Sequence, residues 1–203
     1  MYEIYLGIKR KWSISRISRE IEVSATTVLR EIRRNSNANG YNPLEINLKN
    51  VVSKNVTVKN CKFANFSNNA ISVFGMAEGG VLNIENNTFT LGKTSEAVRI
   101  SNKTNTKFTI NVKDCSYTYP TDAAGQGVGF FLFEDHTSKT AEEANAAMQF
   151  KNLKVNVDNV TFEGAKVTKL NLFTGARNQF ACMYYDKSGY VVDATHFPTF
   201  NFK

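Results

Sequence analysis

The residues of this sequence that could carry acid–base chemistry are few and scattered. The densest group joins the carboxylates of Asp122, Glu134 and Asp135 with the imidazole of His136. Converging carboxylates can cleave sugar chains, and some such sites also hold a calcium ion. An exposed polar loop explains the same four residues more simply. We therefore predict no catalytic residue and no enzyme activity.

The thiol and imidazole side chains do not form a metal-ligand pattern. The chain has three cysteines, Cys61, Cys115 and Cys182, and two histidines, His136 and His196. No pair has the short spacing of a zinc motif, and three cysteines do not make a disulfide framework. The sequence has no glycine-rich phosphate loop and no nucleophile elbow. We therefore predict no metal and no cofactor.

Composition indicates one folded domain of ordinary size with a small appendage. The chain has 203 residues and a net charge of +7, and its content of 42% hydrophobic and 12% aromatic residues excludes a mainly disordered protein. It has no run of about 18 apolar residues, so we expect no membrane partner. It also lacks the apolar core of a secretory signal, so we expect synthesis in the cytoplasm without a signal peptide. Its 24 asparagines favour many tight turns.

Charge and composition divide the chain into a basic segment, a linker and a long body. Residues 1–36 carry eight Lys or Arg and four Glu, a net charge of +4, and the rest of the chain adds only +3. Asn, Gly and Pro cluster between Asn35 and Pro43, which is typical of a turn-rich linker. We predict a basic helical segment at 1–36, a linker at 37–44 and a body at 45–203.

The basic segment has the spacing of two short helices. Ile14, Ile17 and Ile21 recur at intervals of three and four after Ser13, a good helix N-cap. Ser24 can cap a second helix that has one apolar and one basic face. Two short helices joined by a few residues, the second of them basic, are typical of a helix-turn-helix.

The stretch SISRISREIEVSATTVLREIRRN, from Ser13 to Asn35, resembles the N-terminal helix-turn-helix of bacterial insertion-sequence transposases and related phage regulators. The positions that match the family's second helix and its cap are Ser24, Val28, Arg30, Glu31, Ile32, Arg34 and Asn35. Glu22 replaces the glycine usual at the turn, and Ser18 replaces an alanine. The catalytic domain of the transposases does not follow, so the resemblance does not imply transposition.

The resemblance implies duplex DNA as a partner, bound through residues 13–35. The side chains that would face base edges or phosphates are Ala25, Thr26, Thr27, Arg30, Arg33 and Arg34. The alternative is a small basic helical hairpin that docks on another protein.

An eight-residue pattern recurs four times in the body. Its copies begin at Val56, Leu82, Ile110 and Val155, at offsets of 26, 28 and 45 residues. Each copy reads apolar, polar, Val or Ile, polar, Asn or Asp, variable, polar, aromatic. The Asn or Asp positions are Asn60, Asn86, Asp114 and Asn159, and the aromatic positions are Phe63, Phe89, Tyr117 and Phe162.

This pattern predicts a strand, a bend and a second strand in every copy. Alternation up to the Asn or Asp marks a strand with one buried face, and a left-handed Asn turns the chain so that the aromatic again points inward. One such coil cannot bury its apolar face alone, so coils must stack. The body resembles right-handed parallel β-helix proteins of the kind found in phage particles. We predict a mainly β fold, a short right-handed parallel β-helix with a small N-terminal helical segment; an antiparallel sandwich is the alternative.

The repeat makes a definite prediction for two cysteines. Cys61 and Cys115 occupy the same repeat position two coils apart. Because neighbouring strands lie about 4.8 Å apart, the two residues would be roughly 10 Å apart, beyond the reach of a disulfide. We predict that both are reduced and point inward.

The longest offset and the C-terminal end give three further predictions. Thr140 and Glu143 have the spacing of a capping box, so we expect a helical insertion near 140–150 that lengthens one coil. The residues around Gly189 predict a hairpin. The stretch 196–202 predicts a closing strand at the end of the solenoid.

Three functional hypotheses follow. The first is a non-catalytic structural or adhesive protein displayed on a phage virion as a capsid decoration, head fibre or tail-fibre component, anchored by its N-terminal helices. Its partners would be a capsid or other virion protein, further copies of itself and surface glycans. The second is a DNA-binding helix-turn-helix protein with a β-rich oligomerisation or effector body. The third is a carbohydrate-active β-helix enzyme or lectin.

Overall fold

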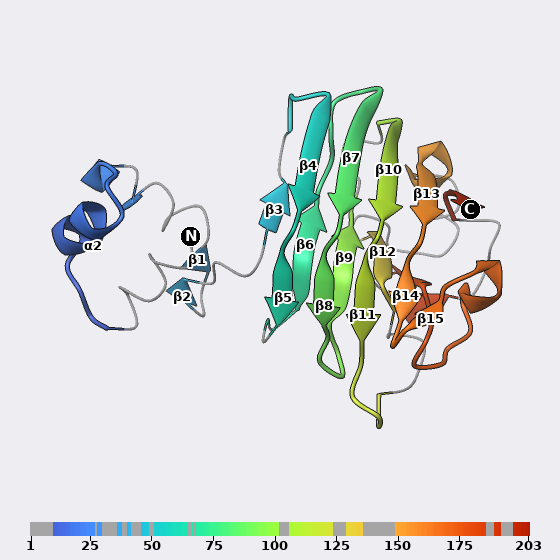
Figure 1. The fold of residues 1–203 in the computed structure, drawn as a ribbon. Coiled ribbons are helices and arrows are strands. Elements are labelled where there is room, and N and C mark those ends of the chain that lie inside the picture. The colour runs from blue at the N-terminus through green and yellow to red at the C-terminus, as the bar shows by residue number, and fades with distance from the viewer. Residues whose placement is uncertain are drawn as a thin grey trace. The chain divides into compact units, whose positions relative to one another are not determined.

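The structure is a computed structural model of the 203-residue chain. The residues that it describes are 10–26, 28–29, 36–37, 40–41, 46–48, 51–64, 66, 68–101, 106–123, 129–135, 149–185, 189–191 and 197–203. The chain forms two compact units, Met1–Ile46 and Asn47–Lys203, and each is described by itself. Figure 1 labels their helices and strands.

The N-terminal unit contains a capped helix followed by a left-handed turn. Helix α2 (Ile14–Glu20) begins after Ser13, whose Oγ accepts a hydrogen bond from the N–H of Arg16 at 3.2 Å. This confirms Ser13 as the N-cap. Glu22 has φ of 53°, so it adopts the conformation that glycine adopts most easily. No helix formed by the described residues is long and apolar enough to cross a membrane.

A second helical stretch follows the turn. Residues 25, 26, 28 and 29 are helical, and the N–H of Val28 donates to the carbonyl of Ser24 at 3.1 Å. The side chains of Ile17 and Val28 are both buried and form a small core. Trp12, Ile14 and Ile21 pack against that core. The apolar spacing seen in the sequence therefore corresponds to a contact between α2 and the stretch after Ser24.

The predicted linker at 37–44 contains a short strand pair. Strand β1 (Ser36–Asn37) pairs antiparallel with β2 (Gly40–Tyr41). Residues 38, 39 and 42–44 lie outside the described residues.

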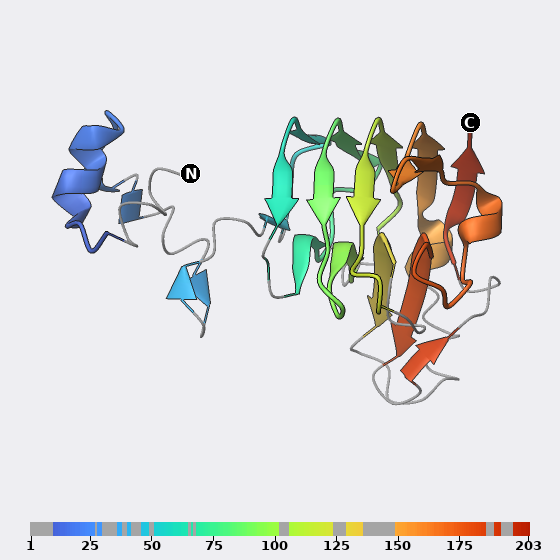
Figure 2. The same cartoon turned by 60° about the horizontal axis from the view of Figure 1, so that its bottom comes forward.

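The C-terminal unit is a parallel β-helix whose chain passes through three sheets in turn (Figures 1 and 2). The first sheet consists of β4 (Asn55–Lys59), β7 (Gly80–Glu85), β10 (Phe108–Lys113), β13 (Lys154–Asp158) and β18 (Thr199–Phe202). The second consists of β5 (Lys62–Ala64), β8 (Thr88–Thr90), β11 (Ser116–Thr118), β14 (Thr161–Phe162) and β15 (Ala165–Lys166). The third consists of β3 (Ile46–Leu48), β6 (Asn69–Val73), β9 (Glu96–Ile100), β12 (Phe131–Asp135), β16 (Ala181–Tyr185) and β17 (Gly189–Val191).

The four copies of the sequence repeat stack in register. Val56 is paired with Leu82, Leu82 with Ile110, and Ile110 with Val155, always in parallel strands. These pairs reproduce the offsets of 26, 28 and 45 residues read from the sequence. The predicted parallel β-helix is therefore confirmed, and the antiparallel sandwich is not the fold.

The C-terminal end of the stack differs from sheet to sheet. In the second and third sheets the last strands, β15 and β17, pair antiparallel with their neighbours. In the first sheet the last strand, β18, pairs parallel with β13. The predicted hairpin around Gly189 is confirmed by β16 and β17, and the predicted closing strand is confirmed by β18.

The expected insertion near 140–150 falls mostly on residues outside the described part of the chain, which resumes at 149. There a short 3-10 helix, η1 (Gln149–Asn152), leads into β13. A second 3-10 helix, η2 (Lys169–Asn171), follows β15 and begins with a capping box at Thr168.

Candidate functional site

The outer face of the first sheet carries a continuous column of hydrogen-bonded polar side chains, which we call the asparagine ladder. Its members are Thr57, Asn83, Asn111, Asn156 and Asn201, one on each strand. Each amide Nδ2 donates to the oxygen of the preceding coil: 3.5 Å for Asn83 to Thr57, 2.8 Å for Asn111 to Asn83, 2.8 Å for Asn156 to Asn111 and 2.9 Å for Asn201 to Asn156. The ladder therefore connects all five strands on their outer face.

A second column lies two residues further along the same strands and alternates in charge. We call it the charge column, and it consists of Lys59, Glu85, Lys113 and Asp158 on the strands, continued by Lys203 directly after β18. Because neighbouring strands lie about 4.8 Å apart, every charge in the column has a neighbour of opposite sign. If a strand paired with the strand two coils away instead of its neighbour, like charges would lie side by side. The column therefore favours a single register.

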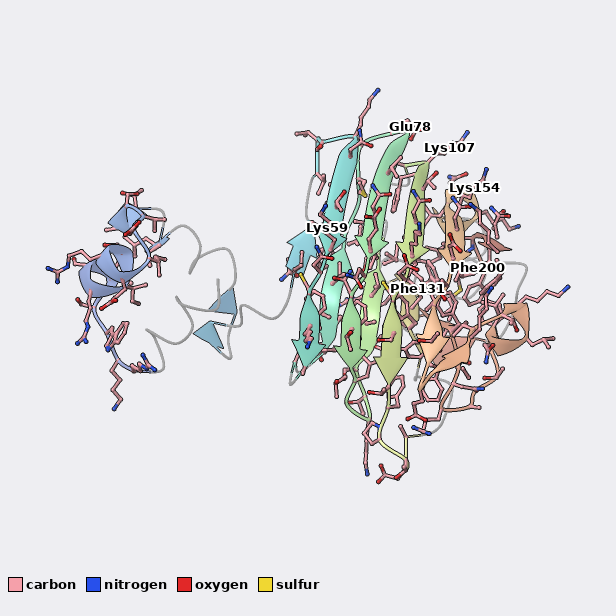
Figure 3. All side chains as sticks on the ribbon, in the orientation of Figure 1. Lys59, Glu78, Lys107, Phe131, Lys154 and Phe200 are labelled. Atoms are coloured by element: carbon pink, nitrogen blue, oxygen red, sulfur yellow. The ribbon has the colours of Figure 1, made fainter. Side chains whose placement is uncertain are left out.

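The two columns border a shallow depression of about 320 Å³. Its lining is polar apart from Val112 and consists of Asn83, Glu85, Asn111, Val112, Lys113, Asn156, Asp158 and Lys203. Figure 3 shows the side chains of this sheet, with Lys59 toward one end of the stack and Phe200 toward the other.

The repeat asparagines form the bend between the first and second sheets. Asn60, Asn86, Asp114 and Asn159 have φ of 58°, 50°, 51° and 50°, so all four adopt the predicted left-handed conformation. Their side chains are also linked between coils: Asn86 Nδ2 donates to Asn60 Oδ1 at 2.9 Å, and Asn159 Nδ2 donates to Asp114 Oδ1 at 2.7 Å. Asn and Asp tolerate this conformation better than other side chains do, which explains the repeat position.

The repeat aromatics point into the core as predicted. Phe63, Phe89, Tyr117 and Phe162 are all buried. The rings of Phe63 and Phe89 stack with centroids 5.0 Å apart, and those of Tyr117 and Phe162 are also 5.0 Å apart. The buried Tyr117 hydroxyl lies 3.0 Å from the carbonyl oxygen of Asn178, which gives it a hydrogen-bond acceptor inside the core.

The cysteines are free, as predicted. Cys115 is buried and Cys61 is half-buried, and Asn87 occupies the same position on the coil between them. The Asn87 side chain accepts from the Cys61 N–H at 2.9 Å and donates to the Val58 carbonyl at 2.9 Å, so it holds the bend of the preceding coil. Burial raises the pKa of the Cys115 thiol to about 11 and that of Cys182 well above its usual value.

The third sheet carries a buried group of charged side chains. Glu134 at the end of β12 pairs with Arg99 of β9, and Glu134 is only 6% exposed. Glu96 at the start of β9 is 4% exposed and accepts a hydrogen bond from Asn69 Nδ2 at 2.8 Å. Burial raises the pKa of Glu96 to about 8, the Asn69 hydrogen bond opposes that rise, and the Glu134 carboxylate adds to it.

Of the four residues considered for sugar chemistry, the structure describes the side chains of Asp122 and Glu134 and pairs them with different cations. Asp122 is exposed and pairs with Lys93, which lowers its pKa, whereas Glu134 is buried and pairs with Arg99. The Asp135 side chain and His136 lie outside the described part of the structure. Within that part, no three His, Cys, Asp or Glu side chains gather closely enough to hold a metal ion.

The residues proposed to contact DNA are described only in part. Ala25 and Thr26 are exposed at the start of the second helical stretch. Thr27, Arg30, Arg33 and Arg34 lie outside the described residues.

The ladder and the charge column are surface features that were not among those predicted from the sequence. A signal for both was present, because each copy of the repeat has a polar residue three positions before its Asn or Asp and a charged residue directly before it. The sign of that charged residue alternates from copy to copy: Lys59, Glu85, Lys113, Asp158.

The chain was compared with protein-family models, with curated proteins and with solved structures. No family model, no curated protein and no solved structure matches it.

Proposed function

We propose that this chain is a non-catalytic structural or adhesive β-helix protein of a phage virion surface, of the capsid-decoration, head-fibre or tail-fibre type. The observation that carries this proposal is the outer face of the first sheet. Its asparagine ladder joins one coil to the next over all five strands, beside a column of charges that alternate in sign. Polar groups used in this way add register and rigidity to a solenoid, which a displayed structural module needs.

The ion pair between Arg177 and Glu163 supports the same structural role. Arg177 donates two hydrogen bonds to the Glu163 carboxylate, at 2.5 and 2.6 Å, and a third to the Tyr119 carbonyl at 2.7 Å. The guanidinium also lies over the ring of Phe162, 5.0 Å from its centroid. A planar, bidentate pair of this kind fixes the loop after β15 against the core.

The partners proposed with this role are a capsid or other virion protein, further copies of the chain, and glycans at the exposed surface. The N-terminal unit would supply the anchor, because it carries a net charge of +4 in its first 36 residues. The display of the solenoid on a particle after synthesis in the cytoplasm is part of the same proposal.

Immunogold electron microscopy tests the proposal directly. An antibody raised against the full chain is applied to particles released from the source cells and to sections of those cells. Regularly spaced label on the particles is the expected result. Label on chromosomal DNA with bare particles would overturn the proposal.

The second candidate function is duplex-DNA binding through residues 13–35. The observation that favours it is the packing of the N-terminal unit: α2, a left-handed turn at Glu22 and a helical stretch after Ser24 meet at Ile17 and Val28. Ala25 and Thr26 are exposed at the start of that stretch, where a recognition helix reads base edges.

Fluorescence anisotropy with a labelled duplex and the full chain tests this candidate. DNA binding predicts an affinity that falls steeply with salt, with a log–log slope that decreases by about one for each phosphate contact removed at Arg33 or Arg34. Lys62→Ala, an exposed substitution on β5, is the matched control and should leave the slope unchanged. Equal slopes for all four proteins would exclude DNA binding by this segment.

A further inference from the structure

We propose that the free edge of β18 binds an extended segment of another protein as an added parallel strand. The segment would carry two apolar residues, an Asn, Ser or Thr between them, and an acidic residue after the second apolar residue. This inference goes beyond the proposed function and does not depend on where the protein is displayed.

Backbone hydrogen bonds to β13 occupy one edge of β18. In the described part of the chain, β13 is the one neighbour of β18 in the first sheet. The N–H of Thr199 donates to the carbonyl of Leu153, directly before β13, at 3.1 Å, and that of Lys203 donates to the carbonyl of Val157 in β13 at 2.9 Å. Because backbone groups alternate in direction along a strand, those of Phe200 and Phe202 face the free edge. A free edge with unpaired N–H and C=O groups is a template for strand addition.

The apolar side chains of β18 are less well covered than those of β13. Phe200 and Phe202 continue the inward columns that contain Val155 and Val157. Val155 and Val157 are buried, whereas both phenylalanines are only half-buried. A further strand with apolar residues at these two positions would cover the rings in the way that β18 covers β13.

The two polar columns determine which side chains an added strand should carry. At the C-terminal end of the ladder, Asn201 Nδ2 donates a hydrogen bond to Asn156 Oδ1, so Asn201 Oδ1 can accept from a donor on an added strand. The charge column ends at the positive Lys203 after the negative Asp158. On an added strand, the ladder position therefore favours a side chain that can donate a hydrogen bond. The charge-column position favours an acidic side chain.

The same two columns disfavour a second copy of the chain as the occupant. Stacking the first coil of one copy on β18 of another would place Lys59 next to Lys203, which adds a repulsion instead of an attraction. At this end the second and third sheets also finish in the antiparallel strands β15 and β17, so they do not continue the parallel stacking. A short acidic segment from a different protein fits the edge better.

A labelled peptide with the sequence of residues 80–86, GVLNIEN, is the probe, because it has the required apolar, Asn and acidic positions. Its affinity for the full chain is measured by fluorescence anisotropy, alongside GVLNIKN as the charge-reversed peptide. We expect the acidic peptide to bind about five- to tenfold more tightly. Methylation of alternate peptide nitrogens that face β18 should abolish binding, because the backbone pairing is lost.

Charge reversal in the protein completes the experiment. The variant Lys203→Glu should reverse the preference between the two peptides. Lys59→Glu, at the other end of the charge column, is the matched control and should leave the preference unchanged. The proposal is overturned if neither peptide binds, if Lys59→Glu instead reverses the preference, or if light scattering shows that the full chain self-associates through this edge and excludes the peptide.

Discussion

The first and third sheets have the same stacked, parallel geometry and use polar side chains in opposite ways. Strands of the first sheet alternate between buried and more exposed residues, as in β7 and β13. In the third sheet, all five residues of β6 are buried, and so are four of the five in β9. The first sheet joins its coils with neutral amides, whereas the third buries the carboxyl groups of Glu96 and Glu134 beside the half-buried Arg99.

The difference matters because burial changes the energy of the same chemical group. An amide pair at the surface replaces hydrogen bonds to water and contributes little on balance. A buried carboxylate loses its hydration and must either find a cation or take up a proton. Glu134 pairs with the Arg99 cation. Glu96 instead takes up a proton, because its pKa of about 8 keeps it mostly protonated at neutral pH. Substitutions in the third sheet should therefore have larger effects than substitutions in the first.

The largest effect is expected from Glu134→Ala. Removing one partner of a buried ion pair leaves the charge of Arg99 without its carboxylate and typically costs about 3–5 kcal/mol. Urea unfolding of the full chain, followed by circular dichroism, measures the loss. The double variant Arg99→Met with Glu134→Leu removes both charges and should be much more stable than the single variant. A single variant that loses less than about 1 kcal/mol would show that the pair is not buried as described.

The next effect is a pH dependence that belongs to Glu96. Its pKa is about 8 in the folded chain and close to 4.5 when unfolded, so the folded state binds more protons between these values. The contribution of Glu96 to the free energy of unfolding should therefore be greatest below pH 4.5, fall as the pH rises toward 8 and then level off, a change on the order of a few kcal/mol. Glu96→Gln should remove most of this slope, measured as the melting temperature between pH 5 and 9. An unchanged slope in Glu96→Gln would assign the pH dependence to another group.

A smaller effect is expected when the ladder is interrupted. Asn111→Ala removes the hydrogen bonds from Asn111 to Asn83 and from Asn156 to Asn111, and should cost about 1 kcal/mol. Thr109→Ala, on the same strand and the same outer face, is the control and should cost less. Equal losses in urea unfolding would mean that the ladder contributes no more than ordinary strand propensity.

The smallest effect is expected from the charge column. Lys113→Glu places three negative side chains in succession, from Glu85 to Asp158, and should cost about 0.5–1 kcal/mol at low salt. The loss should shrink in 0.5 M salt because exposed charges are screened. Lys154→Glu changes the same charge on the outer face, but away from the column, and should be almost neutral. A loss in Lys113→Glu that salt does not reduce would point to a packing cause.

Much of the solenoid could be predicted because its coils repeat the same local pattern. The alternation from Val56 to Asn60 fixes a strand and its buried face, and the left-handed Asn at the end fixes the bend. Equal positions in successive copies then become neighbours in space, as Phe63 and Phe89 do. The free cysteines followed from the same geometry, because Cys61 and Cys115 are two coils apart.

The candidate surface was harder to predict because its partners are distant in sequence. Asn111 and Asn156 are 45 residues apart and bond only because the β-helix brings their strands together. Third-sheet strands such as β9 and β12 do not carry the eight-residue template, so their pairing and burial could not be read from the repeat. Glu134 was consequently considered with Asp122, although the structure pairs the two carboxylates with different cations.

The sequence by itself determined the class of fold, the number and positions of the repeat strands, the inward aromatics and the left-handed asparagines. These features depend on residues at most a few positions apart, so alternation and turn chemistry are sufficient to specify them. Only the tertiary structure decided which charges are buried, how the asparagine ladder joins the coils and which strands end each sheet within the described residues. Those properties depend on what lies on the next coil, and coil-to-coil neighbours are separated by 26 residues or more.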